Sequence, residues 1–197
     1  RGRRYGVDTG TLADPQGPQF SYTQGSPLNW CSGFAVLTYR EGRLLMPELV
    51  EAVKRGDLTA VRSLVATKAN INATEPDGTT ALQLAVHLDD SETVEMLLAA
   101  GANVNGANEY GVTALSLACA NQNELLLEKL LLAGADTKIA QVTGVTPLME
   151  CARVGSAGGV QQLLGRGAAT DARETGSGQT ALMWAAAGGH ASTVNAL

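Results

Sequence analysis

From about residue 47 onward, apolar residues recur in pairs of short runs that have the spacing of one helix face. In the clearest pair, a polar Asp89-Asp90 step separates the two runs. Thr80 stands where an N-cap side chain accepts an orphan backbone N–H, and Gly101 stands where a helix ends in left-handed backbone. The pattern therefore predicts two short helices, with apolar residues Leu82, Leu84, Ala85 and Val86 in the first and Val94, Leu97 and Leu98 in the second.

The same pattern repeats along the chain, and two markers keep its register. A five-residue signature of glycine, any residue, threonine, alanine or proline, and leucine begins at Gly78, Gly111, Gly144 and Gly178, at intervals of 33, 33 and 34 residues. A second marker centres on Ala69, Ala102, Ala135 and Ala168, at intervals of 33 residues each. Such a period indicates a solenoid, whose units bury their apolar faces only against one another.

The signature resembles that of the ankyrin repeat family, most closely in Thr146-Pro147-Leu148 and in the run from Thr180 to His190. The resemblance implies an all-α repeat solenoid of stacked helix-turn-helix units, joined by extended loops near residues 72–79, 105–112 and 138–145. The histidine of the family pattern is replaced in every repeat, so its hydrogen bond to threonine should be missing and the loops less ordered. The replacing residues are Gln83, Ser116, Met149 and Met183.

The repeats occupy residues 47–197. We expect an N-terminal capping repeat from Pro47 to Asn72, three full repeats at 73–105, 106–138 and 139–171, and a truncated last repeat that ends at Leu197 within its second helix. A one-residue insertion falls within Arg173–Ser177, before the last repeat. The run Gly155–Gly159 should weaken the start of the second helix in the third full repeat, because glycine is a poor helix former.

Residues 1–46 form an irregular N-terminal extension, rich in Gly, Pro, Ser and Thr, with a short β-hairpin at its end. The strands are expected at Phe34–Tyr39 and Leu44–Leu45, with Gly42 supplying the tight turn. This extension either packs on the first repeat or is the remnant of another domain.

Residues 5–50 resemble the closing segment of calcineurin-like metallophosphoesterases, in the phrases from Gly6 to Ala13, at Asn29-Trp30 and from Ser32 to Thr38. The Asp-x-His, Gly-Asp, Gly-Asn-His and Gly-His-x-His phrases of that family's metal ligands are absent from the 197 residues. The resemblance implies an alternative reading, in which the chain is the C-terminal fragment of a metallophosphoesterase with an appended ankyrin array for targeting. An unrelated extension fits these residues equally well.

The net charge of −5 is unevenly divided. Residues 1–46 contain five Arg and three acidic residues, which leaves +2, whereas residues 47–197 contain nine basic and sixteen acidic residues, which leaves −7. An acidic array repels phosphates, which argues against nucleic acid and anionic membranes as partners. A role in solubility alone is the other reading of this charge.

Residues capable of chemistry are few and scattered. The three cysteines, Cys31, Cys119 and Cys151, show no metal-binding spacing and should be reduced and structural, which points to the cytoplasm. His190 falls at an inter-helix turn, where a structural hydrogen bond is expected, and His87 falls on an outward helix position. The pattern predicts no enzyme activity, no metal, no cofactor and no small-molecule substrate, and no membrane span or signal peptide is visible.

The remaining candidate is a surface for protein binding. In the ankyrin family, targets lie across the loop tips and the exposed side of the first helices, so the resemblance assigns this role to matching positions. They are Asp77, Thr79, His87 and Leu88 in one repeat, Glu109, Tyr110, Val112 and Asn121 in the next, and Val142, Thr143, Val145, Arg153 and Val154 in the third. Tyr110 is the expected anchor, unless its ring lies on the neighbouring loop, and the valines could instead pack the tips. The prediction is a non-catalytic protein–protein interaction scaffold.

Overall fold

The computed structural model describes residues 38–40, 43–45, 48–67 and 69–197, and the chain divides into two compact units, Arg1–Leu45 and Met46–Leu197. The first unit contains an antiparallel hairpin of β1 (Thr38–Arg40) and β2 (Arg43–Leu45), with Arg40 opposite Arg43. The sequence had placed both arginines in the turn, but they end and begin the strands, because a two-residue connection suffices for a hairpin. Residues 34–37 and Gly42 of the predicted hairpin lie outside the described residues.

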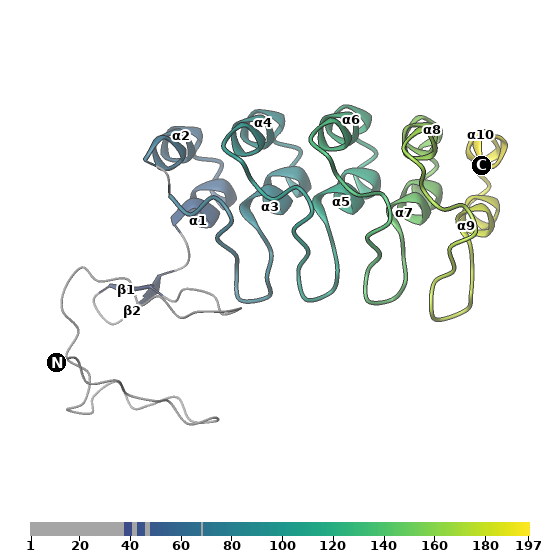
Figure 1. Cartoon of the computed structure of the whole chain (residues 1–197), viewed down its shortest axis with the longest axis horizontal. Helices are drawn as coiled ribbons and strands as arrows, with labels where there is room; N and C mark the ends of the chain where they lie inside the picture. The colour runs from purple at the N-terminus through teal and green to yellow at the C-terminus, as the bar shows by residue number, and fades with distance from the viewer. Residues whose placement is uncertain (1–37, 41–42, 46–47, 68) are drawn as a thin grey trace, which may run out of the picture. The chain divides into compact units, whose positions relative to one another are not determined.

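The second unit confirms the predicted all-α repeat solenoid. Figure 1 shows its helices in two rows, with the odd-numbered helices in one row, the even-numbered helices in the other, and a long loop leading from each pair to the next. The pairs are α1 (Glu48–Lys54) with α2 (Leu58–Ala66), α3 (Ala81–His87) with α4 (Ser91–Ala99), α5 (Ala114–Ala120) with α6 (Glu124–Leu132), α7 (Pro147–Val154) with α8 (Ala157–Gly165), and α9 (Ala181–Ala187) with α10 (Ala191–Ala196).

Side chains at the predicted positions start the helices. Thr80 has extended backbone and its hydroxyl accepts a hydrogen bond from the Gln83 N–H, which confirms it as the N-cap of α3. Thr113, Thr146 and Thr180 cap α5, α7 and α9 in the same way. Helices α2, α4, α6 and α8 make the same bond with other residues: Asp57, Asp90, Asn123 and Ser156 accept the N–H three residues later. A lost cap costs about 1 kcal/mol, so each repeat defines its own helix boundaries.

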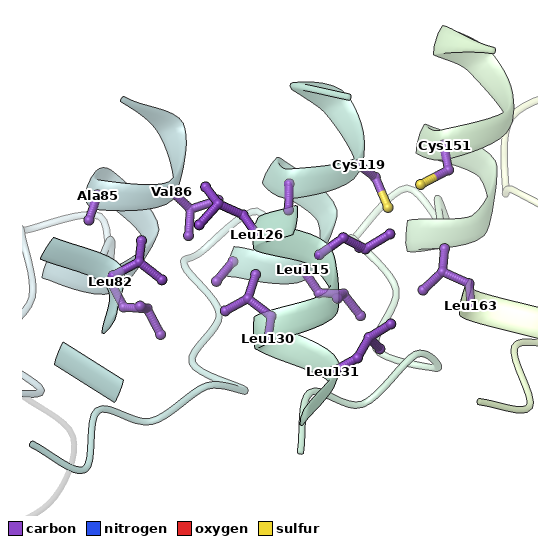
Figure 2. Packing of buried hydrophobic residues seen from close by; sticks show 14 of the residues in the cluster. Leu82, Ala85, Val86, Leu115, Cys119, Leu126, Leu130, Leu131, Cys151 and Leu163 are labelled. Atoms are coloured by element: carbon purple, nitrogen blue, oxygen red, sulfur yellow. The ribbon is translucent and has the colours of Figure 1, made fainter. Parts of the chain in front are cut away.

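A continuous apolar core runs between the two rows of helices. Equivalent leucines Leu82, Leu115 and Leu148 are each 1% exposed, and alanines on the same helices let the rows approach closely. Figure 2 shows side chains from α3, α5, α6, α7 and α8 meeting in this layer, with Leu126 and Leu130 between the helix rows. Each buried leucine stabilises the stack by about 2 kcal/mol.

The side chain of Gln83 makes hydrogen bonds in place of the missing histidine at the first complete loop. Its side chain is 1% exposed; Oε1 accepts the Thr80 N–H at 2.6 Å, and Nε2 donates to the carbonyls of Gly106 (3.1 Å) and Val112 in the next loop. Ser116 instead bonds back to Thr113 within its own repeat. The expected weakening is therefore offset at this loop by a glutamine, which offers both a donor and an acceptor as a neutral histidine does.

The glycine run Gly155–Gly159 extends into the first turn of α8 and allows close packing there. The helix begins at Ala157 and has nine residues, as α2, α4 and α6 do, and the weakening of its start stays a prediction. At Gly159, a Cβ would lie 2.7 Å from Ser156 Oγ and 2.8 Å from Cys151 Sγ, so only glycine fits there. Close packing between α7 and α8 therefore offsets the low helix propensity of this run.

Candidate functional site

The loop tips form a row that is held together by main-chain hydrogen bonds. The Glu109 N–H donates to Asp77 O at 2.9 Å, and the Val142 N–H donates to Tyr110 O at 2.9 Å. The Thr175 N–H continues the row by donating to Thr143 O at 2.8 Å. Adjacent tips are therefore fixed relative to one another.

Hydrogen bonds within each tip also hold its turn. Asp77 accepts the Thr79 N–H at 2.9 Å and the Thr79 hydroxyl at 2.8 Å, and Asn108 Oδ1 accepts the N–H groups of Tyr110 (3.1 Å) and Val112 (3.0 Å). At Gly111 the backbone is left-handed, and a Cβ would lie 2.9 Å from Gln141 Cα of the next loop. The signature glycine is thus required both for its conformation and for the close approach of the next tip.

The predicted site residues differ in exposure. The exposed residues are His87, Leu88, Glu109, Tyr110, Val142, Thr143 and Arg153, and the half-buried ones are Asp77, Thr79, Val112, Asn121 and Val154. Val145 is only 8% exposed and packs with the core beneath the tip, so its side chain offers little area to a partner.

Asn121 uses its carboxamide to join two repeats. Its Nδ2 lies 2.9 Å from Val86 O, 3.2 Å from His87 O and 3.1 Å from Asp89 Oδ1. Asp89 has left-handed backbone, at φ 56°, and also accepts from Asn123. Because these contacts occupy the Asn121 side chain, a structural role accounts for it, and the acidic step at residues 89–90 serves turns and caps.

Tyr110 and Val142 provide the largest apolar area at the tips. The Tyr110 side chain is 60% exposed and Val142 is 73% exposed, on tips that the Val142 N–H joins. The Glu109 carboxylate raises the pKa of the Tyr110 phenol, chiefly through a hydrogen bond, with a smaller contribution from the charge of Asp77. The ring is thus exposed beside two carboxylates.

Neither of these two carboxylates takes part in an ion pair among the described residues. The ion pairs among residues 48–67 and 69–197 use Glu51, Glu75, Glu92, Glu95 and Glu150, so Asp77 and Glu109 have no cationic partner there. The tips of the first two loops therefore combine an exposed aromatic ring with two carboxylates that form no ion pair in this part of the chain. The charge of Asp77 still contributes to the raised pKa of Lys54, after the hydrogen bond to Glu75 that is the main cause.

The sequence did not single out two exposed leucines on α6. Leu125 is 70% exposed and Leu132 is 68% exposed, on the row of helices that the tips do not adjoin. Comparison across the repeat period could have found them, because Glu92 and Ala99 hold the equivalent positions one repeat earlier.

The histidine and the buried thiols have structural roles. His190 Nε2 lies 3.0 Å from Arg153 O and joins the last two repeats, as predicted for this turn. Cys119 and Cys151 are free and buried on neighbouring helices α5 and α7 (Figure 2), and burial raises the pKa of Cys119 well above its ordinary value. Cys31 lies outside the described residues.

Within the described ranges, no three His, Cys, Asp or Glu side chains are placed to hold a metal ion. None of the helices described is long and apolar enough to cross a membrane.

The fourth loop contains the inserted residue, and Glu174 organises it. Its main-chain N–H donates to Gln179 O, a span one residue longer than that from Gln141 to Val145. The carboxylate accepts hydrogen bonds from the Ser177 hydroxyl (2.6 Å) and from the N–H groups of Gln179 (3.1 Å), Ser177 (2.7 Å) and Gly176. These donors, with the Ser177 hydroxyl first, lower the pKa of Glu174 from 4.5 to about 2.

This geometry predicts the pH dependence of the fourth loop. Because the folded pKa of Glu174 lies below its ordinary value, its stabilisation is complete above pH 4.5 and disappears as pH falls through about 2. Replacing Ser177 with Ala should raise the pKa, which a carbon-13 NMR titration of the glutamate carboxyls would measure. An unchanged Glu174 midpoint in that variant would show that the hydroxyl does not hold the charge.

Comparison with known proteins identifies the repeats. A family model described as ankyrin repeats (three copies) matches residues 49–139 and 120–197. No curated protein matches the chain. The match begins at residue 49, so it gives no support to the metallophosphoesterase resemblance of residues 5–50, whose phrases lie almost entirely outside the described residues.

Proposed function

The chain belongs to the ankyrin repeat family, and we propose that it is a non-catalytic scaffold that binds another protein across its loop tips. Members of this family are generally protein-binding modules. The observation that carries the proposal is the exposure of Tyr110 and Val142 on tips joined by a main-chain hydrogen bond. A rigid aromatic beside an aliphatic side chain offers contact area at little cost in conformational entropy.

The charge around Tyr110 supports a partner with a basic residue next to an apolar one. A Lys or Arg side chain above the ring would meet the face of the phenol and the carboxylates of Asp77 and Glu109 together. The adjacent Val142 would then contact the apolar neighbour. The same negative charge makes nucleic acid and anionic membranes poor partners.

Exposure also separates two groups among the residues assigned to this surface. Tyr110, Glu109 and Val142 are the central contacts in our proposal, with His87, Leu88, Thr143 and Arg153 around them. Thr79, Val112, Asn121 and Val154 support the tips and the helix ends that present these side chains. Cys119 and Cys151, free and buried, support a role in the reducing cytoplasm.

A display experiment with random peptides tests this proposal before any natural partner is identified. Peptides selected on the immobilised chain should be enriched in Lys or Arg beside an apolar residue, and their affinity should fall with increasing salt. Replacing Tyr110 with Ala should weaken the selected peptides by about 2 kcal/mol and leave the melting temperature nearly unchanged, because the ring is exposed.

Two variants serve as controls. Tyr110→Phe keeps the ring and should retain most of the affinity, and Leu125→Ala removes an equally exposed side chain from the other row and should not affect binding. A loss of stability as large as the loss of affinity would show that Tyr110 packs its own loops. Selection of acidic peptides would contradict the proposed partner chemistry while leaving a binding function in place.

A further inference from the structure

Asn105 is followed by Gly106, the one Asn-Gly step in the 197 residues. In this dipeptide the main-chain nitrogen of the glycine is sterically unhindered. Rotation of the asparagine side chain can bring its carboxamide carbon within reach of that nitrogen. We propose that Asn105 is a site of spontaneous deamidation, gated by opening of the contact between the linkers that follow α4 and α6.

The reaction requires only water. The Gly106 nitrogen attacks Asn105 Cγ, a C–N bond forms, and the carboxamide nitrogen leaves as ammonia with the proton from the Gly106 amide. Water then adds to either carbonyl carbon of the resulting succinimide. Cleavage of one C–N bond gives aspartate, and cleavage of the other gives isoaspartate, which has one more carbon in the main chain.

The fold holds both reacting groups away from this reaction. Asn105 Oδ1 accepts the Asp136 N–H at 2.8 Å, and Asn105 Nδ2 lies 3.2 Å from Gly134 O, so the carboxamide is fixed to the next repeat. The Gly106 N–H donates to Asn103 O at 3.1 Å. The nitrogen can reach Cγ only when these hydrogen bonds are broken, so the reaction rate reports the open fraction of this contact.

The preceding repeat supplies a matched site in the same chain. Asn72 occupies the equivalent position, its Oδ1 accepts the Asn103 N–H at 2.8 Å, and the Ala73 N–H donates to Asn70 O at 3.1 Å as Gly106 does to Asn103. Ala73 carries a Cβ that hinders attack by its nitrogen. The two sites therefore share these two hydrogen bonds and differ in the residue that performs the attack.

Deamidation would loosen this contact permanently. The product keeps an acceptor for the Asp136 N–H but loses the donor to Gly134 O. It also places a negative charge just beyond the C-terminal end of α6, beside the carboxylate of Asp136, where the helix dipole and the like charge both oppose it. Asn72 has no such donor to lose among the hydrogen bonds described for it, so the two positions should respond differently.

The full chain, incubated at mildly alkaline pH with and without denaturant, tests the proposal by peptide mapping and mass spectrometry. In denaturant Asn105 should deamidate roughly 10-fold or more faster than Asn72, and folding should slow Asn105 roughly 10-fold or more. Gly106→Ala, which copies Ala73, should abolish the difference between the sites. Equal rates at Asn105 with and without denaturant would overturn the gating, and equal rates at Asn105 and Asn72 in denaturant would overturn the site.

A second measurement tests the consequence. Asn105→Asp should reduce hydrogen-exchange protection of the Asp136 amide, whereas Asn72→Asp should affect the Asn103 amide less. Similar losses in the two variants would show that the Gly134 contact does not set the difference.

Discussion

Replacing Gly159 with Val should destabilise the repeat stack by about 3 kcal/mol or more, because the added side chain has no space on either side. A Cβ at this position would lie 2.7 Å from Ser156 Oγ, 2.8 Å from Cys151 Sγ and 3.2 Å from Leu127 Cδ2. Ser156 cannot turn away freely, since its hydroxyl accepts the Gly159 N–H at 3.1 Å as the cap of α8. The valine therefore either disrupts the cap or separates α8 from α7. The midpoint of urea unfolding, followed by circular dichroism, would measure the loss.

Gly165 provides the matched control on the same helix. It is exposed, and a Cβ there would meet nothing within 4 Å, so Gly165→Ala should stabilise the chain by about 0.5 to 1 kcal/mol through helix propensity alone. If Gly159→Val were tolerated as well as Gly165→Ala, the close packing of α8 on α7 would be wrong.

The contrast between these two glycines shows that helix propensity alone does not predict the effect of a substitution in this chain. From the sequence, the run Gly155–Gly159 predicts only a weak helix start, because propensity describes an isolated helix. The atoms that leave no space for a side chain at Gly159 belong in part to Cys151 and Leu127. Leu127 lies 32 residues earlier in the chain, so the sequence pattern does not reveal this contact.

Features repeated with the period were predictable. The N-cap threonines and the buried leucines follow from the 33-residue spacing, because each repeat places the same position in the same environment. At the loop tips, the exposure of equivalent residues varies more from one repeat to the next. Thr79 and Val112 are half-buried at the position where Val145 is 8% exposed, and because two of the three are valines, the side chain alone does not set the exposure.

The candidate surface was predictable only in part. Tyr110 and Val142 are exposed at the tips where the sequence placed them, and their role in binding stays a prediction. The structural use of Asn121 was not predictable, because its carboxamide contacts residues 32 to 35 positions earlier in the chain. A polar side chain at an outward position can serve a partner or a neighbouring repeat, and only the distances distinguish these roles.

Gln83→Met is the substitution with the largest expected cost, about 4 kcal/mol, although methionine is the natural residue at this position in two later repeats. It keeps the volume of the side chain and removes its hydrogen bonds. The Thr80 N–H loses its acceptor and the Gly106 carbonyl loses its side-chain donor, in a place where Gln83 is 1% exposed, whereas the Val112 carbonyl keeps the Asn108 N–H. Each buried group left without a partner costs about 1 to 3 kcal/mol, which exceeds the gain from a more apolar side chain.

Two further substitutions separate the hydrogen bonds from the packing. Gln83→His has one acceptor and one donor, where the glutamine amide group donates twice, and should recover part of the loss that methionine causes. Ser116→Ala, at the equivalent position one repeat later, removes hydrogen bonds only to Thr113 of its own repeat and should cost about 1 kcal/mol. Urea unfolding would rank the three variants, and hydrogen exchange at the Thr80 amide would locate the effect. If Gln83→Met cost no more than Ser116→Ala, the side-chain bridge to the next loop would contribute nothing to stability, and the loops would be held by their main-chain hydrogen bonds alone.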